Sequence, residues 1–213
     1  MKKGFTLSEL LLSLIIVGVI AVLTIPVLLN NVSNKTFATQ VKNMSAIIEQ
    51  LAQDELLTNK TRDLSDTDFG DPEELLTEKH FAIVKSCSSA DSLTDCWKTG
   101  GGDAEVSYKN LNNDAYAITA GDTVVLKNGV MLKYTLTADS DKTIGMFVFD
   151  VNGNDKPNIL GRDLFGFLIT PKGQLVDASV NSNNANKIDS CKSGDDVSWC
   201  YGALVENGWK IDY

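Results

Sequence analysis

The sequence predicts an α+β fold in which one long N-terminal helix packs on an antiparallel β-sheet head. Three observations predict it. Residues 10–29 carry no charged side chain and are almost wholly aliphatic, as in a helix that crosses a membrane. The next segment keeps a single apolar stripe at helical spacing, and β-rich runs separated by turn residues fill residues 105–178.

The apolar segment is long enough to span a bilayer. At 1.5 Å per residue, a helix over residues 10–29 is about 30 Å long, which matches the thickness of a bilayer core. Lys2 and Lys3 precede it. Because basic residues stay on the cytoplasmic side, we expect a cytoplasmic N-terminus and an exported head. The formal net charge of −9 argues against nucleic acid as a partner.

Four cysteines fit an exported head, since disulfides persist in oxidising compartments. Four cysteines allow three connectivities, and proximity favours Cys87 with Cys96 and Cys191 with Cys200. Each of these pairs would close a small local loop. A zinc site made of four thiolates is the alternative, but the closely spaced C-x₂-C pairs that such sites favour are absent from the sequence.

The residues before the apolar segment differ from an ordinary secretory signal. The small residue Gly4 precedes the apolar run, and no small-x-small cleavage site follows it. Glu9 stands at the cytoplasmic edge, where a carboxylate within a membrane helix costs about 2.5–3.5 kcal/mol. Either Glu9 faces water among the headgroups, or it meets a cation from another subunit. Cleavage after Gly4 would create that cation, the amino group of Phe5, and only correctly staggered helices would pair the two charges.

Residues 4–9, which read GFTLSE and lead directly into the apolar run, resemble the leader of type IV prepilins and type II secretion pseudopilins. The resemblance implies that a prepilin peptidase cuts between Gly4 and Phe5 and methylates the new amine. It also implies that Phe5 and Glu9 serve subunit assembly. Pro26 matches a proline common inside the helix of these pilins, where the helix can loosen in the filament. On its own, a proline inside a helix removes a backbone hydrogen bond and produces a kink.

These patterns divide the chain into a leader at residues 1–4, a transmembrane and assembly helix at 5–29, an amphipathic continuation at 30–58 and a globular head at 59–213. In the continuation, apolar residues recur at spacings of four and three between polar ones. They are Phe37, Val41, Met44, Ile48 and Leu51. Such a stripe needs a folded partner, and the resemblance to type IV pilins likewise implies a helix whose second half is embedded in a sheet.

The head is predicted to be a meander of hairpins. Its β-rich runs are Ala115–Thr119, Thr123–Leu126, Val130–Leu136, Ile144–Asp150, Leu164–Thr170 and Gln174–Val176, with tight turns at residues 127–129 and 171–173. Asp71 and Pro72 predict the start of a short helix that runs to about Lys79. His80, the sole histidine, is interpreted as a helix-end or packing residue. At the C-terminus we expect a helix from about Ser198 to residues 207–208, and then a strand that buries Trp209.

One loop between two predicted strands is a candidate metal site. It clusters short oxygen-bearing side chains among Gly and Pro, as calcium prefers, although its spacing is not that of an EF-hand. The candidate calcium ligands are Asp150, Asn152, Asn154, Asp155, Asn158 and Asp163. The alternative, which we favour, is a connector whose Asn and Asp side chains satisfy their own backbone. No other cofactor is expected.

Three function classes remain in view. The first is a structural subunit, a minor pilin or pseudopilin, of a type IV pilus or type II secretion filament. Its expected partners are the prepilin peptidase, other pilin or pseudopilin subunits and an inner-membrane assembly platform, and its final location is an extracellular or periplasmic filament. The second is a filament-tip adhesin or ligand-binding head on the same anchor. The third, a tethered enzyme, is disfavoured because the sequence has no G-x-S-x-G, H-E-x-x-H or phosphate-loop motif.

Overall fold

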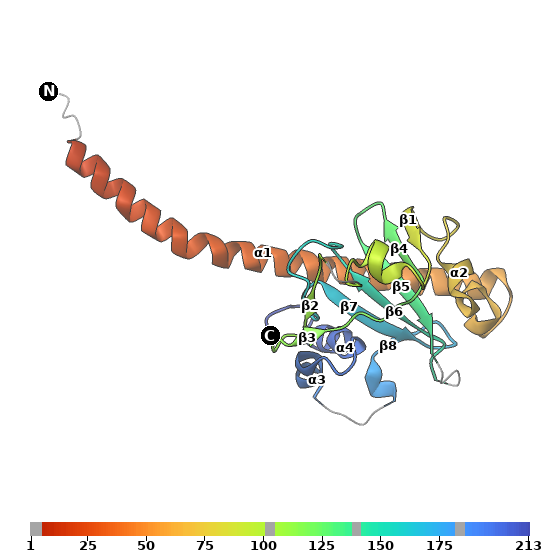
Figure 1. The fold of residues 1–213 in the computed structure, drawn as a ribbon. Coiled ribbons are helices and arrows are strands. Elements are labelled where there is room, and N and C mark those ends of the chain that lie inside the picture. Colours follow the sequence, from red (N-terminus) through yellow and green to blue (C-terminus); the bar gives the residue numbers. More distant parts are fainter. Residues whose placement is uncertain (1–5, 101–104, 138–141, 182–185) are drawn as a thin grey trace.

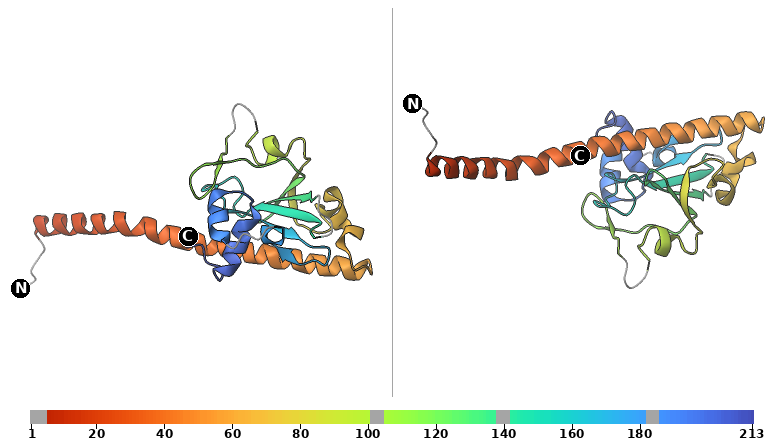
Figure 2. Two further views of the ribbon diagram at one scale, coloured as in Figure 1. Left: turned by 90° about the horizontal axis from the view of Figure 1, so that it is seen from below. Right: turned by 90° about the horizontal axis from the view of Figure 1, so that it is seen from above.

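A computed structural model of the chain describes residues 6–100, 105–137, 142–181 and 186–213, with the side chains at positions 26, 27 and 29–31 left out. The protein is α+β, with one long apolar-to-amphipathic helix and an antiparallel sheet, as the sequence predicts. Helix α1 (Leu7–Thr58) has 52 residues and is therefore about 78 Å long. Its first half projects from the head and its second half runs along the sheet (Figures 1 and 2).

The apolar stripe on the second half of α1 is buried. Val41 and Ile48 are fully buried, Met44 is nearly so, and Phe37 and Leu51 pack at the edge of the core. Two alanines, at positions 38 and 52, extend the same buried face at helical spacing. Their small side chains allow the helix to approach the head closely. The prediction that a folded surface covers this stripe is confirmed.

The main sheet has six antiparallel strands in the order β1-β4-β5-β6-β7-β8. Their bounds are β1 Ile83–Cys87, β4 Thr123–Leu126, β5 Met131–Leu136, β6 Gly145–Asp150, β7 Leu164–Ile169 and β8 Leu175–Val176. Five of these lie within the predicted runs. Gly129 and Gly173 turn two of the hairpins with φ angles of 88° and 79°, a left-handed conformation that favours glycine. The inner strands β6 and β7 are buried almost throughout.

One strand prediction needs correction, and one strand of the main sheet was not predicted. The run Ala115–Thr119 forms only β3 (Ala115–Tyr116), which pairs with β2 (Tyr108–Lys109) in a separate two-stranded sheet. After Tyr116 the chain leaves this pairing, and Thr119 instead accepts hydrogen bonds from the buried Lys133. Strand β1 was not predicted, because its residues are mostly exposed and lack an alternating pattern.

Helical segments outside α1 agree with the sequence in part. Helix α2 (Pro72–Leu75) begins at the predicted cap Asp71, but it ends earlier than Lys79 because the chain then turns to bring Lys79 and His80 to Asp68. Helix α4 (Ser198–Glu206) has nearly the predicted bounds. Helix α3 (Lys187–Ser193) was not predicted. Single turns also form at Leu64–Asp66, Asp68–Gly70, Ser92–Cys96 and Ala178–Val180.

The predicted C-terminal strand is wrong. Residues 207–213 form no strand, and Trp209 is half-buried rather than buried. The tail packs on α1 instead of the sheet: Asn34 Nδ2 donates to the carbonyl of the buried Ile211, and Lys42 Nζ lies 5.7 Å from the centre of the Trp209 ring. These contacts fix the tail to the middle of the long helix, where the helix leaves the head.

Both cysteine pairs are local, as the spacing favoured. Cys87 at the end of β1 is bonded to Cys96, and Cys191 in α3 is bonded to Cys200 in α4. The second disulfide holds the two C-terminal helices together. All four cysteines are buried in the core. The alternative of a four-thiolate zinc site does not apply to this structure.

Candidate functional site

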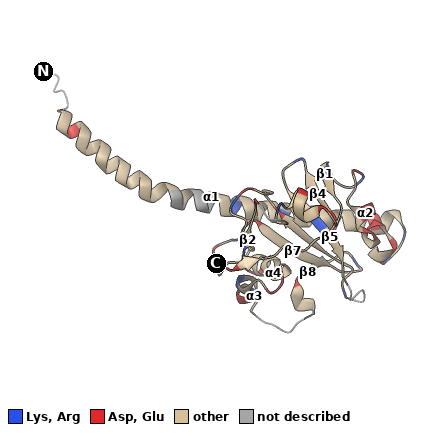
Figure 3. Cartoon of the chain, in the orientation of Figure 1, with Lys and Arg blue, Asp and Glu red and all other residues tan. Residues whose placement is uncertain are grey.

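The N-terminal half of α1 has no protein surface against it. Its large apolar side chains from Leu7 to Ile25 are 51–79 % exposed. These 19 residues are long and apolar enough to cross a membrane. No charged residue occurs from position 10 to position 34, whereas charges are frequent over the head (Figure 3). A helix that is apolar on all sides is stable only in lipid or among other apolar helices.

Thr6 caps the start of α1, and Thr6 and Glu9 hydrogen-bond to each other in both directions. Glu9 N–H donates to Thr6 Oγ1, and Glu9 Oε2 accepts from Thr6 N–H and from Thr6 Oγ1, at 2.8 and 2.7 Å. Such a capping box satisfies two free N–H groups at the start of a helix. The Glu9 carboxylate is therefore turned back toward Thr6, at the N-terminal end of the helix. Gly4 and Phe5 themselves lie outside the described residues.

Pro26 lies inside α1, and the helix continues through it. Its side chain is outside the described set. The ribbon of α1 curves gently along its length and is not broken (Figures 1 and 2). A curved but unbroken helix is what a helix-interior proline produces when the lost hydrogen bond is accommodated.

The candidate metal loop connects β6 to β7. Asp150 is the last residue of β6, and Asp163 immediately precedes β7, so the antiparallel pairing of these strands brings the two carboxyl groups to the same end of the sheet. Asp150 accepts hydrogen bonds from the Asn152 N–H at 3.0 Å and from Tyr108 Oη at 2.8 Å. Asp163 accepts from the N–H groups of Asn158 and Ile159 at 2.6 and 2.7 Å.

The two carboxyl groups are buried close enough to interact. Burial, together with the charge of the neighbouring Asp163, raises the pKa of Asp150 to about 8, against the opposing effect of its hydrogen bonds. Burial also raises the pKa of Asp163 to about 6, against the opposing effect of its backbone hydrogen bonds. Neither residue has a lysine or arginine partner among the ion pairs of the described chain. Two buried acids without a cation are unusual in a stable core.

Three amide oxygens in the same loop also lack a partner. The side-chain oxygens of Asn152, Asn154 and Asn158 are buried and accept no hydrogen bond within the described part of the chain. Two of these amides are held through their nitrogens: Asn152 Nδ2 donates to the carbonyls of Asp155 and Lys156, and Asn154 Nδ2 donates to the carbonyl of Cys96. Asp155 is exposed, and so it lies apart from the other five candidate ligands. Carboxylate and amide oxygens are the ligands that calcium prefers.

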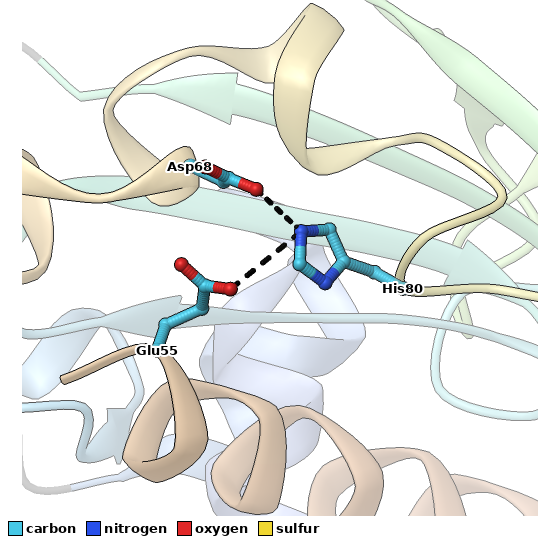
Figure 4. A group of neighbouring side chains, drawn as sticks. All are labelled: Glu55, Asp68 and His80. Carbon is cyan, nitrogen blue, oxygen red and sulfur yellow. Dashed lines mark hydrogen bonds and ion pairs between the residues drawn. The ribbon is translucent and has the colours of Figure 1, made fainter. Parts of the chain in front are cut away.

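A second polar cluster was missed by the reasoning from sequence. Glu55 in the last turn of α1, Asp68 in a single helical turn and His80 just before β1 bring their polar atoms within 4.8 Å of one another (Figure 4). Lys79 Nζ joins them, 2.5 Å from Asp68 Oδ2 and 3.3 Å from Glu55 Oε1. The hydrogen bond from Lys79 holds the pKa of Asp68 below its ordinary value. No sequence spacing links positions 55, 68 and 80, so only the fold could reveal this cluster.

Comparisons with family models, curated proteins and solved structures give no significant match to this chain. The functional argument therefore depends on the residues and on the geometry described above.

Proposed function

We propose that this chain is a structural subunit, a minor pilin or pseudopilin, of a type IV pilus or type II secretion filament. In this proposal a prepilin peptidase cuts after Gly4, and residues 5–29 hold the subunit in the inner or cytoplasmic membrane until it is assembled. The head is exported and has no enzymatic role. The fold in this proposal is that of a type IV pilin: the second half of the helix is embedded in the head, and the first half is free to pack with other subunits.

The observation that carries this proposal is the continuity of α1. One helix has a second half buried in the head and a first half exposed on all sides, directly behind the sequence GFTLSE. A simple membrane anchor needs only an apolar segment, and a flexible linker to the head suffices. A rigid continuation from the membrane segment into the core instead transmits the position of the helix to the head. That property is useful in an assembly in which stacked helices place the heads.

Glu9 supports the same proposal. Its carboxylate is the only charge in residues 6–34, and it lies at the helix start, where cleavage after Gly4 would place the new amine of Phe5. In a bundle of such helices, an acid from one subunit and an amine from another would neutralise each other, whereas either one alone would be a buried charge.

Intact-mass measurement of the protein purified from its native host tests the proposed processing. The expected mass is that of a chain beginning at Phe5 with one added methyl group, and Lys2 and Lys3 are lost. A mature chain that still begins at Met1, or one cut beyond residue 30, would contradict the proposal.

We further propose that calcium binds in the 150–163 loop and stabilises the head. Three buried, unpartnered amide oxygens beside two buried carboxyl groups support this assignment over a plain connector, because a connector would satisfy these atoms itself. The donors are Asp150, Asn152, Asn154, Asn158 and Asp163. With two carboxylates and no bidentate Glu, the site is of the weak extracellular type, with a Kd of about 10⁻⁴–10⁻³ M.

Thermal melting of the full chain in detergent, with calcium or with a chelator, tests this second proposal. Calcium at millimolar concentration should stabilise the head by about 1–2 kcal/mol. Asp163→Asn should abolish the calcium-dependent shift, whereas Asp155→Asn, at the exposed position of the same loop, should retain it. Equal melting temperatures with and without calcium would leave the loop as a connector.

A further inference from the structure

The cluster at Glu55, Asp68 and His80 has the donor set of a transition-metal site. It offers two carboxylate oxygens and one imidazole nitrogen from three segments that are distant in sequence. The side chains of Glu55 and His80 are only 6 % and 3 % exposed, and that of Asp68 is 21 % exposed. Imidazole is not a ligand that calcium uses, but zinc and its neighbours bind imidazole and carboxylate together.

Two of the three distances between donor atoms lie near the value that zinc requires, and the third is at most 4.8 Å. With metal–ligand distances near 2.0–2.1 Å, tetrahedral geometry places donor atoms about 3.3 Å apart. His80 Nε2 lies 2.7 Å from Asp68 Oδ2 and 3.8 Å from Glu55 Oε1, on either side of that value. Figure 4 shows the three groups pointing toward one another. Small side-chain movements would therefore suffice to place all three around one ion.

A hydrogen bond from Asn59 already fixes the orientation of the Glu55 carboxylate. Its second oxygen, Oε2, accepts a hydrogen bond from Asn59 Nδ2 at 2.9 Å, which leaves Oε1 directed at the cluster. Partners of this kind hold metal-binding carboxylates in place in known sites. Glu55 also lies in the last turn of α1, so a bound ion would join the end of the long helix to the segment that precedes β1.

The ammonium group of Lys79 occupies the position that a metal ion would take. It contacts the same two oxygens, Glu55 Oε1 and Asp68 Oδ2, that would face the metal. Yet the Lys79 side chain is 60 % exposed, whereas Glu55 is 6 % and Asp68 is 21 % exposed. A surface cavity of about 390 Å³ lies beside it, and residues 78–83 and Lys127 line this cavity. A flexible, hydrated lysine can leave such a position without opening the core.

We propose that Glu55, Asp68 and His80 form a binding site for a divalent transition-metal ion of the zinc class, in competition with the Lys79 ammonium group. Water completes the coordination from the cavity. The ion replaces one positive charge by two at a pair of carboxylates, and it fastens the end of α1 to the head. This site is separate from the calcium loop and from the filament role, and it holds or fails independently of both.

The test is a titration of the full chain in detergent with zinc chloride, followed by NMR of isotopically labelled histidine. His80 is the sole histidine, so its resonances report this site alone. Zinc should shift them in the wild type. Lys79→Ala should tighten zinc binding by about tenfold or more, because the competing cation is removed. Lys127→Ala, which removes an exposed lysine of the same cavity, should change the zinc affinity by less than about threefold.

The variant His80→Gln removes the proposed imidazole ligand and so tests the site from the side of the metal. It should abolish the zinc-dependent rise in melting temperature that the wild type shows, while it keeps a side chain able to hydrogen-bond to Asp68. Should this variant not fold, the Lys79→Ala comparison still decides the question. Histidine resonances that do not move at about 1 mM zinc would overturn the proposal. So would a Lys79→Ala affinity equal to that of Lys127→Ala, since the lysine would then be a permanent member of a closed ion-pair network.

Discussion

The two halves of α1 share one helix but have opposite relations to their surroundings. From Leu7 to Ile25, apolar side chains cover every side of the helix and are exposed. From Ala38 to Ala52, apolar side chains occupy one stripe, and the head covers it. Polar residues on the other faces of the second half meet water. The distribution of apolar residues around the axis, not the helix itself, distinguishes the two environments.

The difference indicates where each half obtains its stability. The second half gains the hydrophobic free energy of burial within the subunit. The first half can gain it only from outside the subunit, from lipid or from other apolar helices. Substitutions of the same chemical kind in the two halves should therefore have unlike effects on the head.

The largest expected effect is that of Ile48→Ala compared with Ile16→Ala. Ile48 is fully buried, so its truncation should destabilise the head by about 2–5 kcal/mol. Ile16 is 51 % exposed and belongs to the half of α1 that projects from the head, so Ile16→Ala should leave the free energy of unfolding of the head unchanged. Urea unfolding in detergent, followed by the fluorescence of the three tryptophans, measures both. Equal losses would mean that the halves are not energetically distinct.

A smaller effect is expected at Lys133. The first half of α1 exposes apolar side chains, whereas Lys133 is a charged side chain that is buried. Here a charged residue is buried in β5, and its ammonium group donates only to Thr119 in the described structure. Burial lowers its pKa to about 8. A folded-state pKa below the unfolded value means that the penalty is full below pH 8 and is relieved as the pH rises toward about 10.5.

Lys133→Met should therefore stabilise the head by about 1–3 kcal/mol at pH 7, since the shift corresponds to about 3 kcal/mol and the bonds to Thr119 are lost. The gain over the wild type should shrink between pH 8 and pH 10. Parallel urea titrations at pH 7 and pH 10 give the comparison. A variant that is less stable than the wild type at pH 7 would show that the hydrogen bonds to Thr119 outweigh the buried charge.

Much of the fold could be predicted because its signals are local. The stripe with Val41 and Ile48 specifies its own buried face, and the glycines at positions 129 and 173 mark turns through a conformation that other residues avoid. The failures were at elements whose conformation depends on distant contacts. The C-terminal tail packs on Asn34 and Lys42, far from it in sequence, and not on the sheet.

One candidate site could be predicted from local sequence, and the other depends on contacts between distant segments. The 150–163 loop was recognisable because its oxygen-bearing residues are close in sequence, although only the structure could separate the exposed Asp155 from the buried Asp150 and Asp163. The cluster at His80 was not recognisable, because its members come from the end of α1, from a single helical turn and from the turn before β1, and the fold brings them together. The sequence could show one histidine but not which carboxylates would face it.

The most direct test of the account is the substitution Glu9→Gln, for which we expect no effect on head stability. Within the described residues, the Glu9 carboxylate accepts hydrogen bonds from Thr6, and the Glu9 backbone carbonyl accepts one from Ser13 Oγ, so these bonds stay within the start of the helix. The measurement is recovery of a tagged variant with partner subunits from sheared filaments or cross-linked membranes of the native host. Ser13→Ala, a neutral change in the same segment, is the matched control. The account predicts that Glu9→Gln is inserted and cleaved but is absent from the assembled fraction, whereas Ser13→Ala is present. Recovery of Glu9→Gln at the wild-type level would contradict it.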